Sequence, residues 1–384
     1  MSKRSKIIDL LLCLFLGVFG IHRFYEGKIV TGILYLFTFG CLGLGVLIDF
    51  MQIIFGCRTD KEKLPIGKPN EKHGKIIKTL SVVAAIILWF LFGFLIARYM
   101  MNLPMVEKEY YNKVDPAFTL EKKYTKLGEF ETSVIEFQSG EKLFDKYKVW
   151  YPSVLEQNNN QKYPIVVMAN GTGVPFAKFS EVFKHLASWG FVVIGNDDDS
   201  SWTGLSSSAA LKYIIALNDN SKSIFYQKLD TKNIGISGHS QGGVGAINAV
   251  TDFDSSNLFT SIYTASTTAL ELAKALEWNY DVTKIKIPYF MVASTGKADA
   301  DLIAPLKSVY ENYSNLDQST PAIMARRKNV DHGDMLAYAD GYMTAWFRYT
   351  LMNDEEASKV FRGESPEISA NTTNWQDVKI KNIE

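Results

Sequence analysis

Gly238-His239-Ser240-Gln241-Gly242 is the stretch that decides the fold, because it places a serine two residues from a glycine on either side. A short β-like run, residues 233–237, precedes it, and a run of small and apolar residues, 243–250, follows it. A serine on a sharp strand-to-helix turn needs glycines there, since the backbone comes too close for side chains. The stretch predicts a nucleophile elbow and a serine hydrolase, although chance alone would give the motif in roughly one such chain in ten.

Composition separates the chain into two parts. Its 384 residues carry 41 basic and 41 acidic side chains, so the zero net charge gives no indication of a nucleic-acid partner. Apolar residues dominate the first hundred or so positions, and the rest has the composition of a soluble domain. Cys13, Cys41 and Cys57 all lie in or beside the apolar part. The soluble part therefore has no disulfide framework or cysteine metal site.

Three apolar stretches predict three transmembrane helices: residues 7–21, 29–55 and 80–97. A cleaved signal peptide is the less favoured interpretation of the first, because no small-x-small cleavage site follows it. Basic residues precede the first stretch and crowd the second connection, which carries Arg58, Lys61, Lys63, Lys68, Lys72, Lys75 and Lys78. The positive-inside rule then puts the N-terminus and this connection in the cytoplasm.

We therefore expect a multi-pass protein of the cell membrane with its soluble part outside. The expected segments are a two-helix hairpin domain (1–56), a basic cytoplasmic loop (57–78), a third transmembrane helix (79–100), a tether (101–115) and an extracytoplasmic domain (116–384).

The hairpin carries its own signature. Gly17-Val-Phe-Gly20-Ile-His-Arg-Phe-Tyr25, followed by several glycines and then Asp49, resembles the family of two-helix transmembrane hairpin domains with an Asp-Arg-Phe or His-Arg-Phe turn. Small residues let helices approach closely in lipid. Asp49 should face a partner such as Arg23 or lie near the membrane interface. A plain anchor is as good an interpretation as sensing or transport.

In the soluble part, strand-like and helical runs alternate. The expected strands are residues 130–137, 146–151, 163–169, 191–196, 233–237, 261–265, 288–294 and 322–327, and the longer helices are 176–189 and 334–351. Such alternation predicts an α/β fold whose mainly parallel sheet is covered by helices on both faces.

A serine nucleophile needs a base and an acid, and five histidines are available. Elimination favours His332, which lies in a polar loop between the last strand and the last long helix, over His22, His73, His185 and His239. We expect the side chain of His239 to turn away from the nucleophile. The loop after residue 294 offers two acids; we favour Asp301, which begins Asp-Leu-Ile-Ala-Pro305, and keep Asp299 as the alternative.

Two backbone N–H groups are candidates for the oxyanion hole, those of Gln241 and Thr172. Thr172 belongs to Asn170-Gly-Thr-Gly173, whose glycines are also compatible with a simple turn. The acidic run Asp197-Asp-Asp199 is better interpreted as a solvated loop than as a cation site, so neither a metal nor an organic cofactor is expected.

Several motifs in order resemble cutinase-like polyester hydrolases and the related chlorophyllase and dienelactone-hydrolase-type α/β-hydrolases over residues 125–365. They are Tyr151-Pro152, Asn170-Gly-Thr172, residues 186–193, residues 229–243, Asp301-Leu-Ile-Ala-Pro305 and Ala345-Trp-Phe-Arg348. The resemblance implies hydrolysis of carboxylic esters with Ser240, Asp301 and His332 as triad and Thr172 and Gln241 as oxyanion donors. Polyester hydrolases have an aromatic residue at the Thr172 position and often a tryptophan after the next strand; here only Tyr263 lies nearby, which disfavours an aromatic clamp.

The sequence thus predicts a membrane-anchored serine hydrolase that cleaves esters of lipids, cell-envelope polymers or captured nutrients. A serine peptidase or acyltransferase on the same fold is the first alternative, because fold and triad do not separate these activities. A membrane scaffold with an inactive hydrolase domain is the second.

Overall fold

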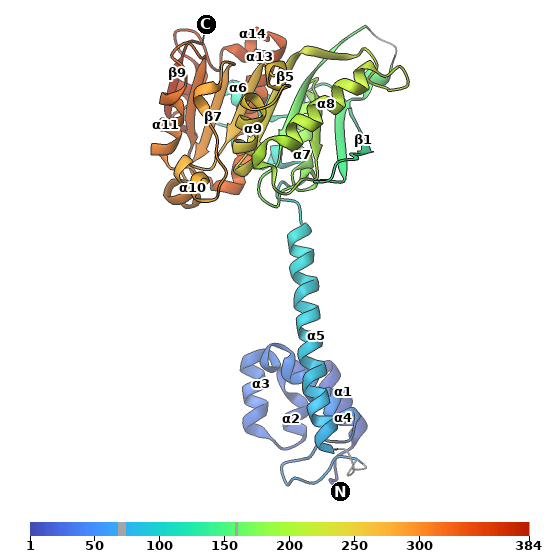
Figure 1. Ribbon diagram of the computed structural model, residues 1–384. Helices are drawn as coiled ribbons and strands as arrows, with labels where there is room; N and C mark the ends of the chain where they lie inside the picture. Colours follow the sequence, from blue (N-terminus) through green and yellow to red (C-terminus); the bar gives the residue numbers. More distant parts are fainter. Residues whose placement is uncertain (68–73, 158–159, 384) are drawn as a thin grey trace. The chain divides into compact units, whose positions relative to one another are not determined.

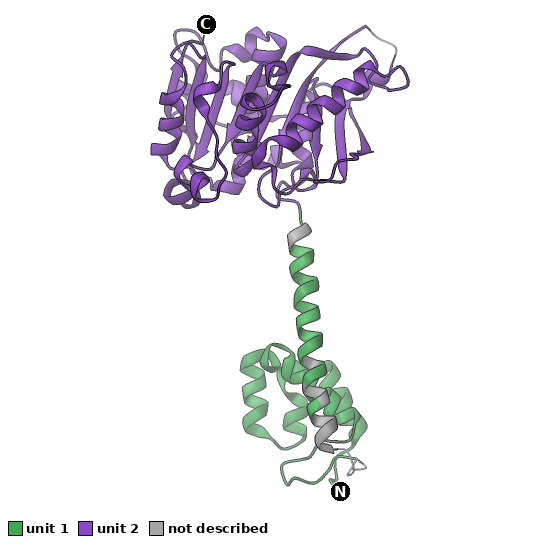
Figure 2. Ribbon diagram, viewed as in Figure 1, with its two compact units in different colours: residues 1–103 green, residues 104–384 purple. Residues whose placement is uncertain are grey.

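The computed structural model describes residues 1–67, 74–157 and 160–383 and divides into two compact units, Met1–Leu103 and Pro104–Glu384 (Figure 2). Lys68, Lys72 and His73, which belong to the expected basic loop, lie outside the described residues.

The first unit is helical. Its helices are α1 (Lys6–Leu16), α2 (Ile21–Tyr25), α3 (Ile29–Leu42), α4 (Leu44–Ile54) and α5 (Gly74–Asn102), with a 3-10 turn, η1 (Gly17–Phe19). The stretch expected as one long second span is two helices, bent by 106° where Gly43 adopts a positive φ of 82°. Within the described residues no single helix meets the length and hydropathy of a membrane span, whereas the bent pair does so jointly. The expectation of three separate spans is therefore not supported by this structure.

The charged residues of this unit form a buried network around Asp49. Its carboxylate accepts hydrogen bonds from Arg23 (Nε–Oδ2, 2.6 Å) and His22 (Nε2–Oδ2, 2.8 Å) and pairs with Arg58 (2.7 Å). Glu26 forms a second ion pair with Arg58. The expected pairing of Asp49 with Arg23 is confirmed, and the network lets acidic and basic groups be buried together.

The second unit is built on a mixed sheet, nine-stranded in its described residues, with the order β1-β2-β4-β3-β5-β6-β7-β8-β9 (Figure 1). The strands are β1 (Thr132–Gln138), β2 (Lys146–Pro152), β3 (Tyr163–Ala169), β4 (Val192–Asn196), β5 (Leu229–His239), β6 (Ser261–Ala265), β7 (Tyr289–Ser294), β8 (Ala322–Arg327) and β9 (Trp375–Lys381). Strands β3 to β8 run parallel, and the outer strands β1, β2 and β9 pair antiparallel with their neighbours.

Helices cover both faces of this sheet. Along β3, Ile165 and Val167 join one buried cluster while Val166 and Met168 join the other, which is why the strand is apolar at every position. The helices on the first face are α8 (Leu205–Asp219), α9 (Gln241–Thr251) and α11 (Leu306–Asn315); those on the second are α7 (Ser180–Ser188), α12 (Met335–Tyr338) and α13 (Asp340–Met352). The shorter helices are α6 (Thr119–Thr125), α10 (Leu270–Ala275), α14 (Glu355–Ser358) and α15 (Glu367–Ala370).

The eight expected strands correspond to β1–β8, and β9 is an additional edge strand. The expected helix 334–351 is divided between α12 and α13, which meet at Ala339. The expected tether is wrong for most of its length. Val106 and Tyr110 are each only 3% exposed and belong to the core of the second unit, so the chain from Pro104 onward is part of the folded domain.

Candidate active site

Ser240 lies on the predicted turn, between the end of β5 and the start of α9. Its backbone has φ 59° and ψ −124°, a conformation that non-glycine residues rarely adopt and that marks functional sites. The two glycines are needed because a side chain at either position would clash with the backbone. A Cβ on Gly238 would lie 2.0 Å from the Gly242 carbonyl oxygen, and a Cβ on Gly242 would lie 2.3 Å from the Ala169 carbonyl oxygen. The packing therefore requires the glycine pattern from which the elbow was predicted.

His332 receives its carboxylate partner from the loop after β7, and that partner is Asp299. The distance from His332 Nδ1 to Asp299 Oδ1 is 2.6 Å. Oδ2 of the same carboxylate accepts hydrogen bonds from the Ser294 N–H (2.8 Å) and the Ser266 hydroxyl. Burial alone would raise the pKa of Asp299, but the hydrogen bond and charge of His332, together with the serine donors, lower this pKa below its ordinary value of 3.8.

The structure contradicts the preference for Asp301. Asp299 begins a helical turn of the π type, Asp299–Ile303, and is fully buried, whereas Asp301 is exposed. Side chains two positions apart on a helical backbone point in different directions, so only one of the two aspartates can meet the histidine. In the described residues, no hydrogen bond joins Asp301 to His332.

The His332 loop is fixed by local contacts. The Asp331 carboxylate accepts from the His332 N–H (2.8 Å), and the Asp334 carboxylate accepts from the Asp331 N–H (3.0 Å), forming a capping box. No hydrogen bond joins the Ser240 hydroxyl to His332 in the described part of the chain. Such catalytic contacts are often long in a substrate-free enzyme and shorten when substrate binds.

His239 is a site residue that sequence reasoning missed. Instead of turning away, its ring lies 4.5 Å from that of His332, and its Nε2 is 2.8 Å from the His332 carbonyl oxygen. Burial, and then repulsion from His332, lower the pKa of His239 to about 3, so the ring is neutral and Nε2–H donates this hydrogen bond. No local sequence pattern gives the direction of this side chain.

The candidate oxyanion donors lie around the elbow. Gln241 is the first residue of α9, where a backbone N–H has no partner within the helix. Thr172 lies on a turn closed by the Val174 N–H and the Gly171 carbonyl (3.1 Å), with a positive φ of 62° at Gly173. A Cβ on Gly171 would lie 3.3 Å from the His239 carbonyl oxygen, so this turn packs against the elbow.

Neither position at which polyester hydrolases carry an aromatic residue has an exposed aromatic side chain here. Tyr263 is only 3% exposed, inside β6, and Thr172 is exposed but not aromatic. The acidic run is used for structure: Asp197 accepts the N–H groups of Asp145 (2.9 Å) and Lys146 (2.8 Å), and the Asp198 side chain accepts that of Ser200. No group of three or more metal-ligating side chains is found in the described residues.

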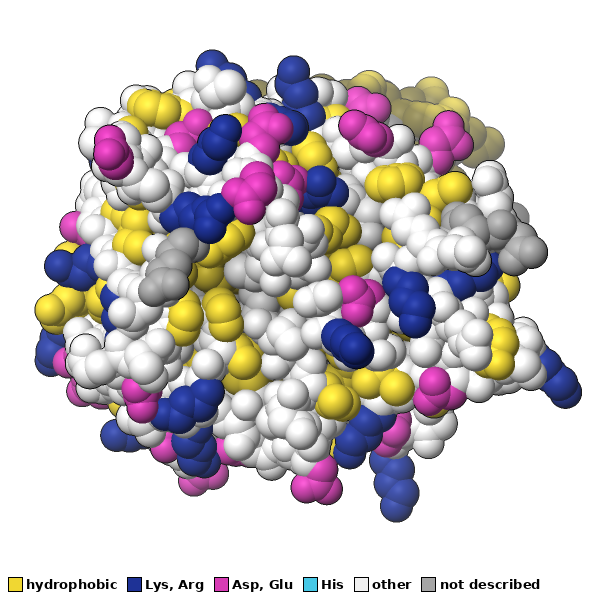
Figure 3. All heavy atoms as spheres, turned by 90° about the horizontal axis from the view of Figure 1, so that it is seen from above, with side chains coloured by type: hydrophobic (Ala, Val, Ile, Leu, Met, Phe, Trp, Pro, Cys, Tyr) yellow, Lys and Arg dark blue, Asp and Glu magenta, His cyan; other side chains and the backbone are white. Residues whose placement is uncertain are grey.

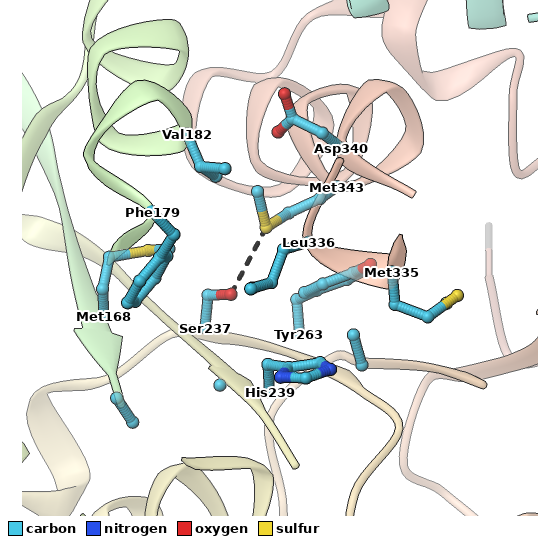
Figure 4. A pocket seen from close by; sticks show the side chains of 13 residues that line it. Met168, Phe179, Val182, Ser237, His239, Tyr263, Met335, Leu336, Asp340 and Met343 are labelled. Carbon is cyan, nitrogen blue, oxygen red and sulfur yellow. Dashed lines mark hydrogen bonds between the residues drawn. The ribbon is translucent and has the colours of Figure 1, made fainter. Parts of the chain in front are cut away.

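A small cavity of about 20 Å³ lies beneath the elbow (Figure 4). It is lined by the residues of β5 that precede Ser240, by Tyr263 and by Asp340, and the Ser237 hydroxyl donates to Met343 Sδ (3.3 Å) across it. Its volume is enough for about one water molecule and far too small for a substrate.

A family model for PET hydrolase-like proteins matches residues 108–378. The chain belongs to this family. A second model, for the TM2 domain, matches residues 2–51, so the N-terminal unit carries a TM2 domain, whose relatives include membrane proteins.

Individual relatives divide along the same boundary. A TM2 domain-containing protein of Dictyostelium discoideum is 39% identical over 87 residues, which are 23% of this chain and 51% of that protein. The uncharacterized membrane protein YozV of Bacillus subtilis is 43% identical over 61 residues, 16% of this chain and 76% of that protein. The bis(hydroxyethyl) terephthalate hydrolase of Streptomyces coelicolor is 28% identical over 193 residues, 48% of this chain and 54% of that enzyme. This chain thus spans only about half of two of these relatives.

Proposed function

We propose that this chain is a membrane-anchored serine hydrolase that cleaves carboxylic esters through an acyl-enzyme. The observation that carries the proposal is the 2.6 Å contact between Asp299 and His332 at the sheet edge that also holds Ser240. Membership of the PET hydrolase-like family and the similarity to an enzyme that acts on a terephthalate ester support an ester as substrate.

In the proposed mechanism, His332 Nε2 takes the proton of Ser240 as the hydroxyl oxygen attacks the ester carbonyl. Asp299 holds Nδ1 protonated and stabilises the imidazolium. The N–H groups of Gln241 and Thr172 bind the oxyanion. The imidazolium gives its proton to the leaving alcohol, and a water activated by the same histidine then releases the carboxylic acid and restores Ser240.

The arrangement in the membrane is part of the proposal. The TM2 domain supports a membrane location, and the excess of basic residues before residue 7 and between residues 57 and 78 favours a cytoplasmic N-terminus. If the apolar residues 80–97 cross the membrane after a two-helix hairpin, the hydrolase domain lies outside the cytoplasm.

Fluorophosphonate labelling of the full chain tests the mechanism. We expect the wild type and Ser237→Ala, which removes a nearby buried hydroxyl, to be labelled, and Ser240→Ala to remain unlabelled. A panel of short esters and matched peptides then separates an esterase from a peptidase. Failure of the correctly folded wild type to react would favour the inactive scaffold instead.

A further inference from the structure

The chain enters the hydrolase domain at the edge formed by the C-terminal ends of the parallel strands. This edge carries the candidate active site. Parallel strands end at this edge, and Thr172, Ser240, Asp299 and His332 follow β3, β5, β7 and β8 respectively. The opposite edge holds the C-terminus, since Lys381 of β9 pairs with the first residue of β8 (Figure 1).

The entering segment contacts both sides of the site. The N–H groups of Met105 (2.8 Å) and Val106 (3.1 Å) donate to the Lys178 carbonyl, in the 3-10 turn that follows the Thr172 loop. The Met105 side chain lies beside Gly333, whose Cβ, if present, would be 3.4 Å from Met105 Cε. The last residues before the domain core are therefore neighbours of the His332 loop.

Chain length limits how far this edge can lie from the apolar segment. Met105 lies eight positions after Ala97, the last residue of the apolar run, so the two lie no more than about 28 Å apart even if the chain were fully extended. A domain of about 280 residues is roughly 48 Å across. The short connection therefore keeps Met105, at the active-site edge, within about 28 Å of Ala97. It places no such limit on the opposite edge, which holds the C-terminus.

The surface beside the site carries apolar side chains. Exposed apolar side chains lie near the site, on the entering segment and just after Asp299: Met105 (42% exposed), Leu302 (60%) and Leu306 (37%). The opposite edge, seen in Figure 3, shows basic, acidic and hydrophobic side chains interspersed, so the feature that distinguishes the active-site edge is the entry of the chain beside it. A membrane-facing surface suits exposed aliphatic side chains.

We propose that the hydrolase domain takes its ester directly from the lipid bilayer, with the apolar rim of the site resting on the membrane surface. The substrate is then an ester whose acyl chain is embedded in the membrane, rather than a freely diffusing nutrient. This inference rests on the proposed ester hydrolysis and on insertion of residues 80–97 into the membrane.

Spacers between Leu103 and Pro104 test the inference in full-length protein reconstituted in phosphatidylcholine vesicles. A helical (EAAAK)₃ insert adds about 22 Å and holds the domain away, whereas a Gly/Ser insert of the same length lets it return to the surface. With a fluorogenic long-chain diacylglycerol ester in the bilayer, we expect the helical insert to lower the rate at least tenfold and the flexible insert to lower it less than threefold. Hydrolysis of soluble p-nitrophenyl acetate should be equal in all three proteins.

Equal rates on the membrane-borne ester for all three proteins would overturn the inference, as would a wild type that hydrolyses only the soluble ester. These results differ from failure of the proposed function, in which neither ester is hydrolysed and fluorophosphonate does not label the wild type.

Discussion

Replacement of Asp299 by asparagine should abolish most activity for a reason that the contacts of its two oxygens define. Oδ2 accepts from the Ser294 N–H and the Ser266 hydroxyl, so in Asp299→Asn the remaining side-chain oxygen must keep that place. The new NH₂ group then faces His332 Nδ1, which Oδ1 contacts in the wild type. Nδ1 becomes the acceptor and Nε2 carries the proton, so the histidine cannot take the proton of Ser240.

A triad histidine in the wrong tautomer costs on the order of 10⁴ in kcat, or about 5 kcal/mol of transition-state stabilisation. We expect this loss for Asp299→Asn and less than a threefold change for Asp301→Asn, whose exposed side chain does not contact His332. The assay is the initial rate of p-nitrophenyl acetate hydrolysis, with thermal unfolding showing that both variants fold. A larger loss in Asp301→Asn, or an Asp299→Asn enzyme within tenfold of the wild type, would refute the assignment.

Three further predictions concern stability. His239→Phe should flatten the pH dependence of the unfolding free energy. The folded pKa of about 3 lies below the unfolded value of 6.5, so between these pH values the unfolded state binds the extra proton, and wild-type stability falls by up to about 1.4 kcal/mol for each pH unit below 6.5. Unfolding free energies from urea titrations that change equally with pH in wild type and variant would count against this. Gly238→Ala should cost about 3 kcal/mol and abolish fluorophosphonate labelling, whereas Gly173→Ala, with free space around it but a positive φ, should cost about 1 kcal/mol; similar melting temperatures for the two would contradict the contact argument. Asp49→Asn leaves the partly buried Arg23 without a carboxylate and the buried Arg58 with Glu26 as its remaining one, so it should cost about 3 kcal/mol in detergent; an unchanged melting temperature would show that the network does not hold the first unit together.

The elbow and the central strands could be predicted because their causes are local. A strand buried on both faces must be apolar throughout, as β3 is, and the glycines around Ser240 are required by contacts within the turn itself. Strand β9 (Trp375–Lys381) was missed because its alternation is broken: Gln376 and Asp377 are consecutive polar residues, Asp377 has a positive φ of 55°, and the pairing with β8 shifts its register at this point. Its pairing with β8 depends on residues about 50 positions away.

The choice between Asp299 and Asp301 could not be made from the sequence, since both follow the same strand and only the helical phase of the turn separates them. The docking of residues 104–114 was equally hidden. Val106 and Tyr110 have helical spacing, but their segment forms only the 3-10 turn Tyr110–Asn112, and the burial of Tyr110 depends on distant residues, the His185 ring of α7 and the Asp340 carboxylate of α13.

The domain holds a second histidine–aspartate pair, and the difference between the two pairs shows what a catalytic site requires. His185 Nδ1 lies 2.8 Å from Asp340, and both side chains are fully buried, with the Tyr110 hydroxyl donating to the same carboxylate. Burial alone would lower the pKa of His185, but Asp340 raises it, and the pair lies in the core where Tyr110 of the entering segment docks. In the Asp299–His332 pair only Asp299 is fully buried, while the His332 side chain keeps 19% of its surface exposed. A base must be reachable by substrate and its acid must not be, and of these two pairs only Asp299–His332 meets both conditions.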